Sequence, residues 1–193
     1  MTKDWSILEG AVNNCRRCPL GEMRTNPVIG RGSRQADIML IGEGPGQQED
    51  LTGVAFVGPA GQLLDKMLAS VGLSDRDVYI ANIVKCRPPG NRDPLPDERE
   101  ACINYLRYQL GLVKPKIIVC LGRIAATTII SPEFKITRQR GEWIERKGYY
   151  ITATYHPSAL LRDESKKRPA WEDFKAIKAK YTELKEKGEL NEH

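Results

Sequence analysis

Four cysteines with the chemistry of metal ligands lie in the first 102 residues of the chain. They are Cys15, Cys18, Cys86 and Cys102. Soft thiolates of this kind bind zinc or an iron–sulfur cluster, and their spacing, C-x2-C and then C-x15-C, does not choose between the two. The stretches 15–36 and 85–96 show no helical or strand pattern, and both contain cysteines, which indicates a metal site that anchors them. A fifth cysteine, Cys120, lies in an apolar run and is interpreted as a small buried hydrophobe.

Two side chains suited to acid–base or electrostatic catalysis follow apolar runs. Glu43 lies in the glycine-rich turn 42–46 (GEGPG), where backbone N–H groups such as that of Gly44 approach a ligand. The turn lacks the P-loop pattern, which argues against nucleoside triphosphate hydrolysis. His156 is the one histidine of the chain besides His193. A glycine-rich turn or a lone histidine is more often structural, but both follow predicted parallel strands and so fall at the same edge of the sheet.

An amide and an aromatic ring complete the candidate site. Asn82 lies near the end of another apolar run, and its side chain offers a donor beside an acceptor, which matches the edge of a nucleobase. Phe56 supplies a ring on which a base stacks. Either residue, taken alone, is more often part of a core.

Apolar runs and helical periodicity predict the elements that position these residues. Branched apolar runs predict buried parallel strands at 37–42, 77–84, 116–121 and 149–155. Helical spacing predicts helices over 60–71, 96–110, 122–130 and 169–186. Alternating strands and helices indicate an α/β fold with a central, mainly parallel, four-stranded sheet, and 193 residues fit a single domain over 1–193.

Composition and charge narrow the class of protein. The formal net charge is +5, with arginines concentrated in the connecting segments beside the motifs, which favours nucleic acid as a partner. No apolar run is long enough to span a bilayer, so we expect no membrane association. The N-terminal residues lack a signal-peptide pattern, and we expect a cytoplasmic protein with reduced thiols. We expect a monomer, because no apolar heptad pattern calls for a partner.

These motifs together resemble the uracil-DNA glycosylase superfamily, and specifically its iron–sulfur family 4. The matching segments cover nearly the whole chain and read CRRCPL, GEGPGQQED, AFVGPAGQLL, ANIVKCRPPGNR, LGR, RGEW and HPSALLR. The resemblance implies the three-layer α/β/α fold of these enzymes. It also implies excision of uracil from single- or double-stranded DNA. The four cysteines would hold a structural [4Fe-4S] cluster, which decides for iron over zinc.

The resemblance also implies roles for individual residues. Glu43 would position the attacking water and offset positive charge on the sugar, and His156 would donate a hydrogen bond to uracil O2. Phe56 would stack on the base, Asn82 would read its O4 and N3–H, and Glu49 would exclude the methyl group of thymine. A second set would contact DNA: the segment 159–162 would enter the minor groove, and a helix-opening turn would bind phosphate. These residues are Gly58, Gly61, Ser158, Leu160 and Arg162.

Two departures and three alternatives accompany this interpretation. Residue 47, often acidic in this motif, is glutamine, and the segment 135–140 lacks the histidine with which a related group bonds covalently to DNA. The alternatives are a non-catalytic iron–sulfur DNA-binding module, an electron-transfer protein, and a glycosylase for another lesion such as hypoxanthine or a mismatched base. The joint presence of Glu43, Asn82 and His156 argues against a binding module.

Overall fold

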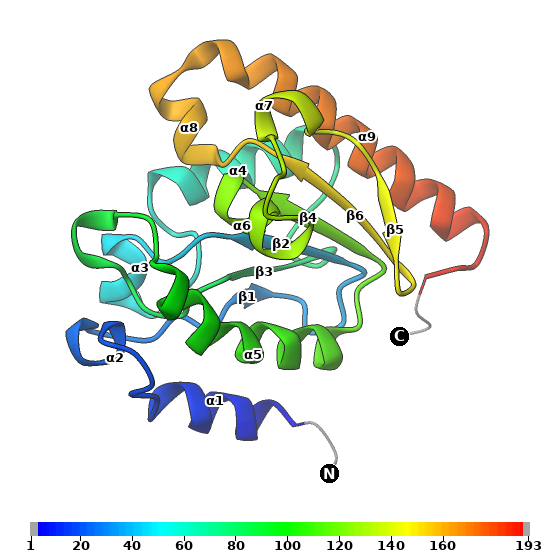
Figure 1. The fold of residues 1–193 in the computed structure, drawn as a ribbon. Helices are drawn as coiled ribbons and strands as arrows, with labels where there is room; N and C mark the ends of the chain where they lie inside the picture. The colour runs from blue at the N-terminus through cyan, green and yellow to red at the C-terminus, as the bar shows by residue number, and fades with distance from the viewer. Residues whose placement is uncertain (1–3, 191–193) are drawn as a thin grey trace.

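The computed structural model describes residues 4–190 (Figure 1). The predicted domain of 1–193 extends past this part at both ends, and His193 lies outside it. None of the helices within 4–190 is long and apolar enough to cross a membrane.

One mixed sheet forms the centre of the fold. Its strands are β1 (Arg31–Gly32), β2 (Ile38–Gly42), β3 (Val78–Asn82), β4 (Ile117–Leu121), β5 (Ile144–Arg146) and β6 (Tyr149–Thr154). The order across the sheet is β1-β3-β2-β4-β6-β5. The four inner strands are parallel, with Gly42 of β2 opposite Asn82 of β3, while β1 and β5 are antiparallel edge strands. The predicted parallel core is confirmed, but the sheet has six strands rather than four.

Helices cover both faces of the sheet (Figure 1). The longer ones are α1 (Trp5–Asn13), α4 (Pro59–Ser70), α5 (Pro96–Val113), α6 (Arg123–Ile129) and α9 (Lys167–Glu186). The short ones are α2 (Leu20–Met23), α3 (Gln47–Thr52), α7 (Ile136–Gln139) and α8 (Pro157–Arg162), with 3-10 turns at Pro89–Asn91 and Glu164–Lys166.

The core is divided by the sheet into two apolar layers. Every residue of β2, β3 and β4 is buried, as expected of parallel strands covered on both faces. Alternate side chains enter opposite layers: Met39 packs with residues of α5 and α6, and Leu40 packs with residues of α4, α8 and α9. The architecture is therefore the predicted three-layer α/β/α sandwich.

The two stretches without a helical or strand pattern in the sequence, 15–36 and 85–96, differ in how much secondary structure they contain. Segment 15–36 contains the short helix α2 and the two-residue strand β1, so it is less irregular than predicted. Segment 85–96 contains a single 3-10 turn before α5 begins. Segment 85–96 contributes residues to the lining of the cavity described below, whereas 15–36 contributes none.

Candidate active site

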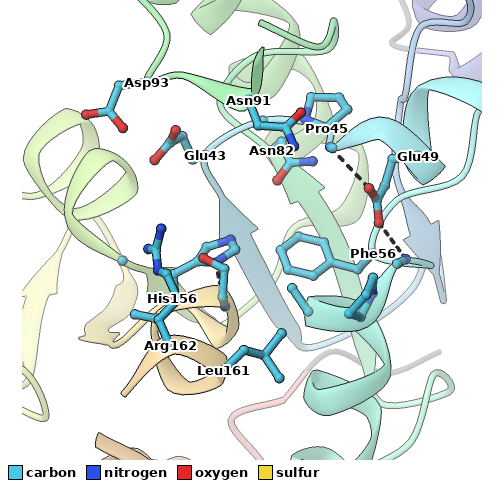
Figure 2. Close-up of a pocket in the computed structure, with 18 of the residues that line it drawn as sticks. Glu43, Pro45, Glu49, Phe56, Asn82, Asn91, Asp93, His156, Leu161 and Arg162 are labelled. Atoms are coloured by element: carbon cyan, nitrogen blue, oxygen red, sulfur yellow. Dashed lines mark hydrogen bonds between the residues drawn. The ribbon is translucent and has the colours of Figure 1, made fainter. Parts of the chain in front are cut away.

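A cavity of about 760 Å³ opens at the carboxyl ends of the parallel strands (Figure 2). Glu43 follows β2, Asn82 ends β3, and His156 comes two residues after β6. All three line the cavity, together with Gly44, Glu49, Phe56, Gly58, Ser158 and Arg162. The structure thus brings together the catalytic and base-contacting residues expected from sequence.

The floor of the cavity depends on the missing side chain of Gly42. A β-carbon on Gly42 would lie 2.5 Å from Oδ1 of Asn82 and 2.6 Å from Cζ of Phe56. Phe56 itself has a left-handed backbone with φ of 53°, and a β-carbon on Gly61 would lie 1.8 Å from its carbonyl oxygen. Two glycines therefore leave the space in which the Phe56 ring and the Asn82 amide meet.

Asn82 presents an acceptor that lacks a partner. The residue is 1% exposed, and among the described residues its buried Oδ1 accepts no hydrogen bond. Leaving a buried acceptor unpaired costs about 1–3 kcal/mol, so such groups are kept where a ligand supplies the donor. The cavity therefore carries a hydrogen-bond acceptor suited to an N–H group of a bound molecule.

His156 is held in one tautomer by the start of α8. It is the N-cap of that helix, and its Nδ1 accepts the backbone N–H of Ser158 at 3.1 Å and lies 2.8 Å from the Ser158 hydroxyl. Because Nδ1 accepts, the proton of the neutral ring is on Nε2. Burial, assisted by Arg162, lowers the pKa of His156 to about 4, so the ring is neutral at pH 7. The site therefore offers a neutral Nε2–H donor.

The surroundings of His156 restrict how the ring moves. A β-carbon on Gly122, whose φ is +88°, would lie 2.8 Å from Cβ of His156. On the cavity side, the imidazole and the Phe56 ring have centroids 5.6 Å apart at an interplanar angle of 35°. A flat molecule that stacks on Phe56 therefore places its edge beside the imidazole.

Glu43 is half-buried at the cavity rim and is close to its titration point at neutral pH. Burial and the neighbouring Asp93 raise its pKa to about 7, while Arg123 and Arg162 oppose the rise. Figure 2 shows the Glu43 and Asp93 carboxyl groups on the same side of the cavity. Asp93 in turn forms an ion pair with Arg123. The Glu43 carboxyl group is therefore suited to hold a water molecule or to face developing positive charge.

Glu49 lines the cavity, but both of its carboxylate oxygens are bound by the backbone. Oε1 accepts the N–H groups of Val57 at 2.9 Å and Gly58 at 2.7 Å, and Oε2 accepts that of Gly46 at 3.1 Å. Glu49 therefore ties the turn that carries Phe56 to the loop that carries Glu43. Its carboxylate is fixed and cannot retreat from a bound ligand.

The structure corrects two of the residues assigned to DNA contact. Leu160 is fully buried and packs in the core layer of α4 and α9, so it is not available as a wedge. The neighbouring Leu161 is 50% exposed and lines the cavity. The N–H of Gly58 is already bound to Glu49, so Gly58 is not a free phosphate donor. Ser158 has its hydroxyl beside His156, where it orients the ring.

The four cysteines assigned to a cluster interact with one another. Cys86 and Cys102 are buried, and Cys18 packs against the core layer that contains them. The thiols of Cys18 and Cys15 act electrostatically on Cys86, and burial raises the pKa of Cys102 to about 11. Within residues 4–190 no group of three or more His, Cys, Asp or Glu side chains is arranged to hold a single metal ion.

The hydrogen bonds around these sulfurs favour an anionic centre. Arg24 Nη1 donates to Cys86 Sγ at 3.1 Å, and the backbone N–H of Lys85 donates to Cys102 Sγ at 3.3 Å. N–H donors on cysteine sulfurs are a recognised means of stabilising iron–sulfur thiolates. The chemistry of this donor set, sulfurs that accept N–H hydrogen bonds, therefore fits thiolate ligands of a cluster. Cys120 is fully buried in β4, as predicted.

Sequence reasoning assigned no role to several groups that line the cavity. Asp93, Asn91 and Arg123 lie on its rim. Asn91 belongs to the quoted segment that ends in GNR, Asp93 follows that segment directly, and Arg123 belongs to LGR. Their position in or beside these two motifs was the only indication of a role that the sequence offered. Gly42 and Gly122 were likewise visible in motifs, but the close approach that requires glycine depends on the fold.

Comparison with known proteins agrees with the arrangement of the site. A family model described as the uracil DNA glycosylase superfamily matches residues 29–175. Type-4 uracil-DNA glycosylases from Archaeoglobus fulgidus and Thermotoga maritima are 47% and 42% identical, covering 86% and 90% of this chain and 87% and 92% of their own. A third, from Sulfurisphaera tokodaii, is 44% identical over 86% of this chain and 80% of its own. The chain belongs to the uracil DNA glycosylase superfamily and, within it, to the type-4 uracil-DNA glycosylases.

Proposed function

We propose that this protein removes uracil from DNA by hydrolysing the bond between the base and the sugar, leaving an abasic site. The observation that carries the proposal is the unpartnered Oδ1 of Asn82, buried in a cavity beside the donor of His156. Uracil presents an N–H between two carbonyl groups, which is the pattern that an acceptor and flanking donors recognise.

Base recognition follows from the orientation of these groups. With the extruded uracil stacked on Phe56, Asn82 Oδ1 accepts its N3–H and Nδ2 donates to O4. Cytosine has an amino group at position 4 and a bare ring nitrogen at position 3, so both contacts become repulsive. The rejection of cytosine therefore requires that the Asn82 amide keeps this orientation, because the flipped amide would match cytosine.

His156 and Glu43 divide the electrostatic work of bond cleavage. The leaving uracil carries negative charge, which the Nε2–H of His156 stabilises through a hydrogen bond at O2. The sugar develops positive charge, which the Glu43 carboxylate offsets while it orients the attacking water. Since the pKa of Glu43 is about 7, a large fraction is ionised at neutral pH.

Glu49 is proposed to exclude thymine. Its carboxylate lines the cavity and is held by three backbone N–H groups, so it forms a rigid wall rather than a mobile side chain. A 5-methyl group that meets this wall would have to break those hydrogen bonds.

DNA contact is proposed for the exposed face of α8 and its surroundings. Leu161 replaces Leu160 as the wedge that fills the gap left by the flipped nucleotide, and Arg162 binds phosphate beside it. We further propose that a monomer, with 1–193 as one domain, acts in the cytoplasm on single- or double-stranded DNA.

The cysteines are proposed to hold a [4Fe-4S] cluster. Cys15, Cys18, Cys86 and Cys102 would be its ligands, and the N–H donors from Arg24 and Lys85 suit thiolates. The cluster would supply structural cross-linking between segments 15–36 and 85–96, and no step of the reaction passes through it.

A panel of oligonucleotides that each contain one lesion tests the function. We expect free uracil and an abasic site from uracil-containing strands, and no release of thymine or cytosine. Release of hypoxanthine without release of uracil would replace the proposed substrate, and binding without release of any base would favour a binding module. Protein purified anaerobically should contain iron and sulfide, and Cys120→Ala should keep both. Stoichiometric zinc would refute the cluster.

A further inference from the structure

Lys85 is a lysine side chain buried in the core beside the candidate cluster. It is 1% exposed and stands among the largest fully buried side chains of the described residues. Its Nζ donates to the backbone carbonyl of Asn82 at 2.7 Å. A buried ammonium is expensive to maintain, so its position calls for a specific reason.

Cysteine sulfurs lie near this ammonium. In the described part of the chain, Cys102 and Cys86 favour the charged form of Lys85, whereas burial, the larger effect, opposes it. The backbone N–H of Lys85 donates to Cys102 Sγ at 3.3 Å, and its carbonyl accepts the N–H of Val28 at 2.7 Å. The residue thus contacts both cysteine-bearing segments of the fold.

The same residue reaches the base-reading group. Asn82 ends β3, and the carbonyl that Lys85 holds belongs to the residue whose side-chain amide enters the cavity. Fixing this carbonyl fixes the backbone from which the amide projects. One residue therefore contacts a cysteine sulfur through its backbone N–H and the base-reading residue through its side chain.

We propose that Lys85 is a positioning residue that couples the cysteine cluster to uracil recognition. The negative charge of the cluster thiolates keeps the ammonium buried, and the ammonium orients Asn82 through its carbonyl. The inference rests on the proposed cluster and on the proposed role of Asn82, and it gives the cluster an influence on specificity beyond cross-linking two segments.

Three variants of the iron-loaded protein distinguish an effect on both the cluster and uracil binding from an effect on one of them. Two properties are measured on each: the affinity for free uracil, from competition with uracil-containing DNA, and the reduction potential of the cluster, with iron content as a check. Lys85→Met should weaken uracil binding roughly tenfold, about the size of one lost hydrogen bond. It should also make the potential more negative, because a buried positive charge no longer favours the reduced cluster.

Two controls each remove one end of the link. Arg24→Met removes a cation that donates to Cys86 Sγ without contacting Asn82, so it should lower the potential and leave uracil affinity unchanged. Asn82→Ala should weaken uracil binding and leave the potential unchanged. A residue that served only to fill the core would not move both properties at constant iron content.

The outcomes distinguish this inference from the proposed function. If the wild-type protein holds no iron or releases no uracil, the proposed function fails and the coupling fails with it. If the wild type behaves as proposed but Lys85→Met alters one property alone, the coupling by itself is refuted. Should Lys85→Met be insoluble, Lys85→Gln removes the charge but keeps a side-chain N–H donor for the Asn82 carbonyl. It should keep iron and make the potential more negative, and an unchanged potential there would refute the coupling.

Discussion

The Asp93 carboxyl group lies beside that of Glu43 at the rim of the cavity (Figure 2) and, after burial, is the main cause of the raised pKa of Glu43, about 7. If ionised Glu43 is the active form, the single-turnover rate should rise with pH through about 7. Asp93→Asn removes a negative charge, so the pKa of Glu43 should fall and the profile should move to lower pH. Arg123→Met removes a cation that lowers this pKa, and its profile should move to higher pH. Profiles that coincide with the wild type in both variants would exclude Glu43 as the titrating group.

His156→Ala should slow cleavage while leaving DNA binding intact. Losing one donor to the leaving anion costs on the order of 3 kcal/mol, or roughly a hundredfold in rate. The low pKa of His156, about 4, means that the profile between pH 6 and 8 reflects another group. Single-turnover rates at saturating enzyme, beside affinities at several salt concentrations, separate the two effects. A wild-type rate in this variant would remove His156 from the mechanism.

Leu160 and Leu161 form a matched pair of opposite exposure. Leu160→Ala should lower the free energy of unfolding by about 2–5 kcal/mol, because it leaves a cavity in the core. Leu161→Ala should change stability little but weaken binding to uracil-containing duplex, with less effect on single strands that need no wedge. Denaturant unfolding and duplex affinity, measured on both variants, provide the check. If Leu160→Ala instead keeps its stability and loses duplex binding, Leu160 rather than Leu161 is the residue that enters the duplex.

Glu49 is proposed to exclude the methyl group of thymine, and it also connects two loops through hydrogen bonds. Two substitutions separate these roles. Glu49→Gln keeps the size but weakens the acceptor set for three backbone N–H groups, so uracil excision should fall while thymine stays excluded. Glu49→Ala removes both, and thymine should become a slow substrate. The rates of thymine and uracil release, measured on both variants, test these roles. If Glu49→Gln releases thymine, the size of the side chain is not what excludes it.

The sequence was sufficient to predict the parallel centre of the fold, because the runs at β2 and β4 are apolar and the run at β3 is apolar up to Asn82. It did not indicate β1 and β5, which have two and three residues and form by pairing with a neighbour. Helix α8 was not predicted, and which of two adjacent leucines faces the core depends on how that short helix packs.

The place of a residue in the candidate site was predictable where its type is rare in the chain, as for His156, and where motifs carried a resemblance. Asp93 escaped notice because one acidic residue among many has no distinguishing pattern, and its effect on Glu43 depends on distance. The buried position of Lys85 was similarly hidden, since lysine is ordinarily a surface residue.

The order of the strands affects when activity first appears during synthesis. The cavity takes Glu43 from the end of β2, Asn82 from the end of β3 and His156 from beyond β6, and β6 pairs with β4. A nascent chain that has left the ribosome only as far as β4 contains Asn82 but lacks His156, the proposed donor to the uracil anion. On the proposed roles, a partly synthesised chain should not release uracil, because the site residues come together only when β6 joins the sheet.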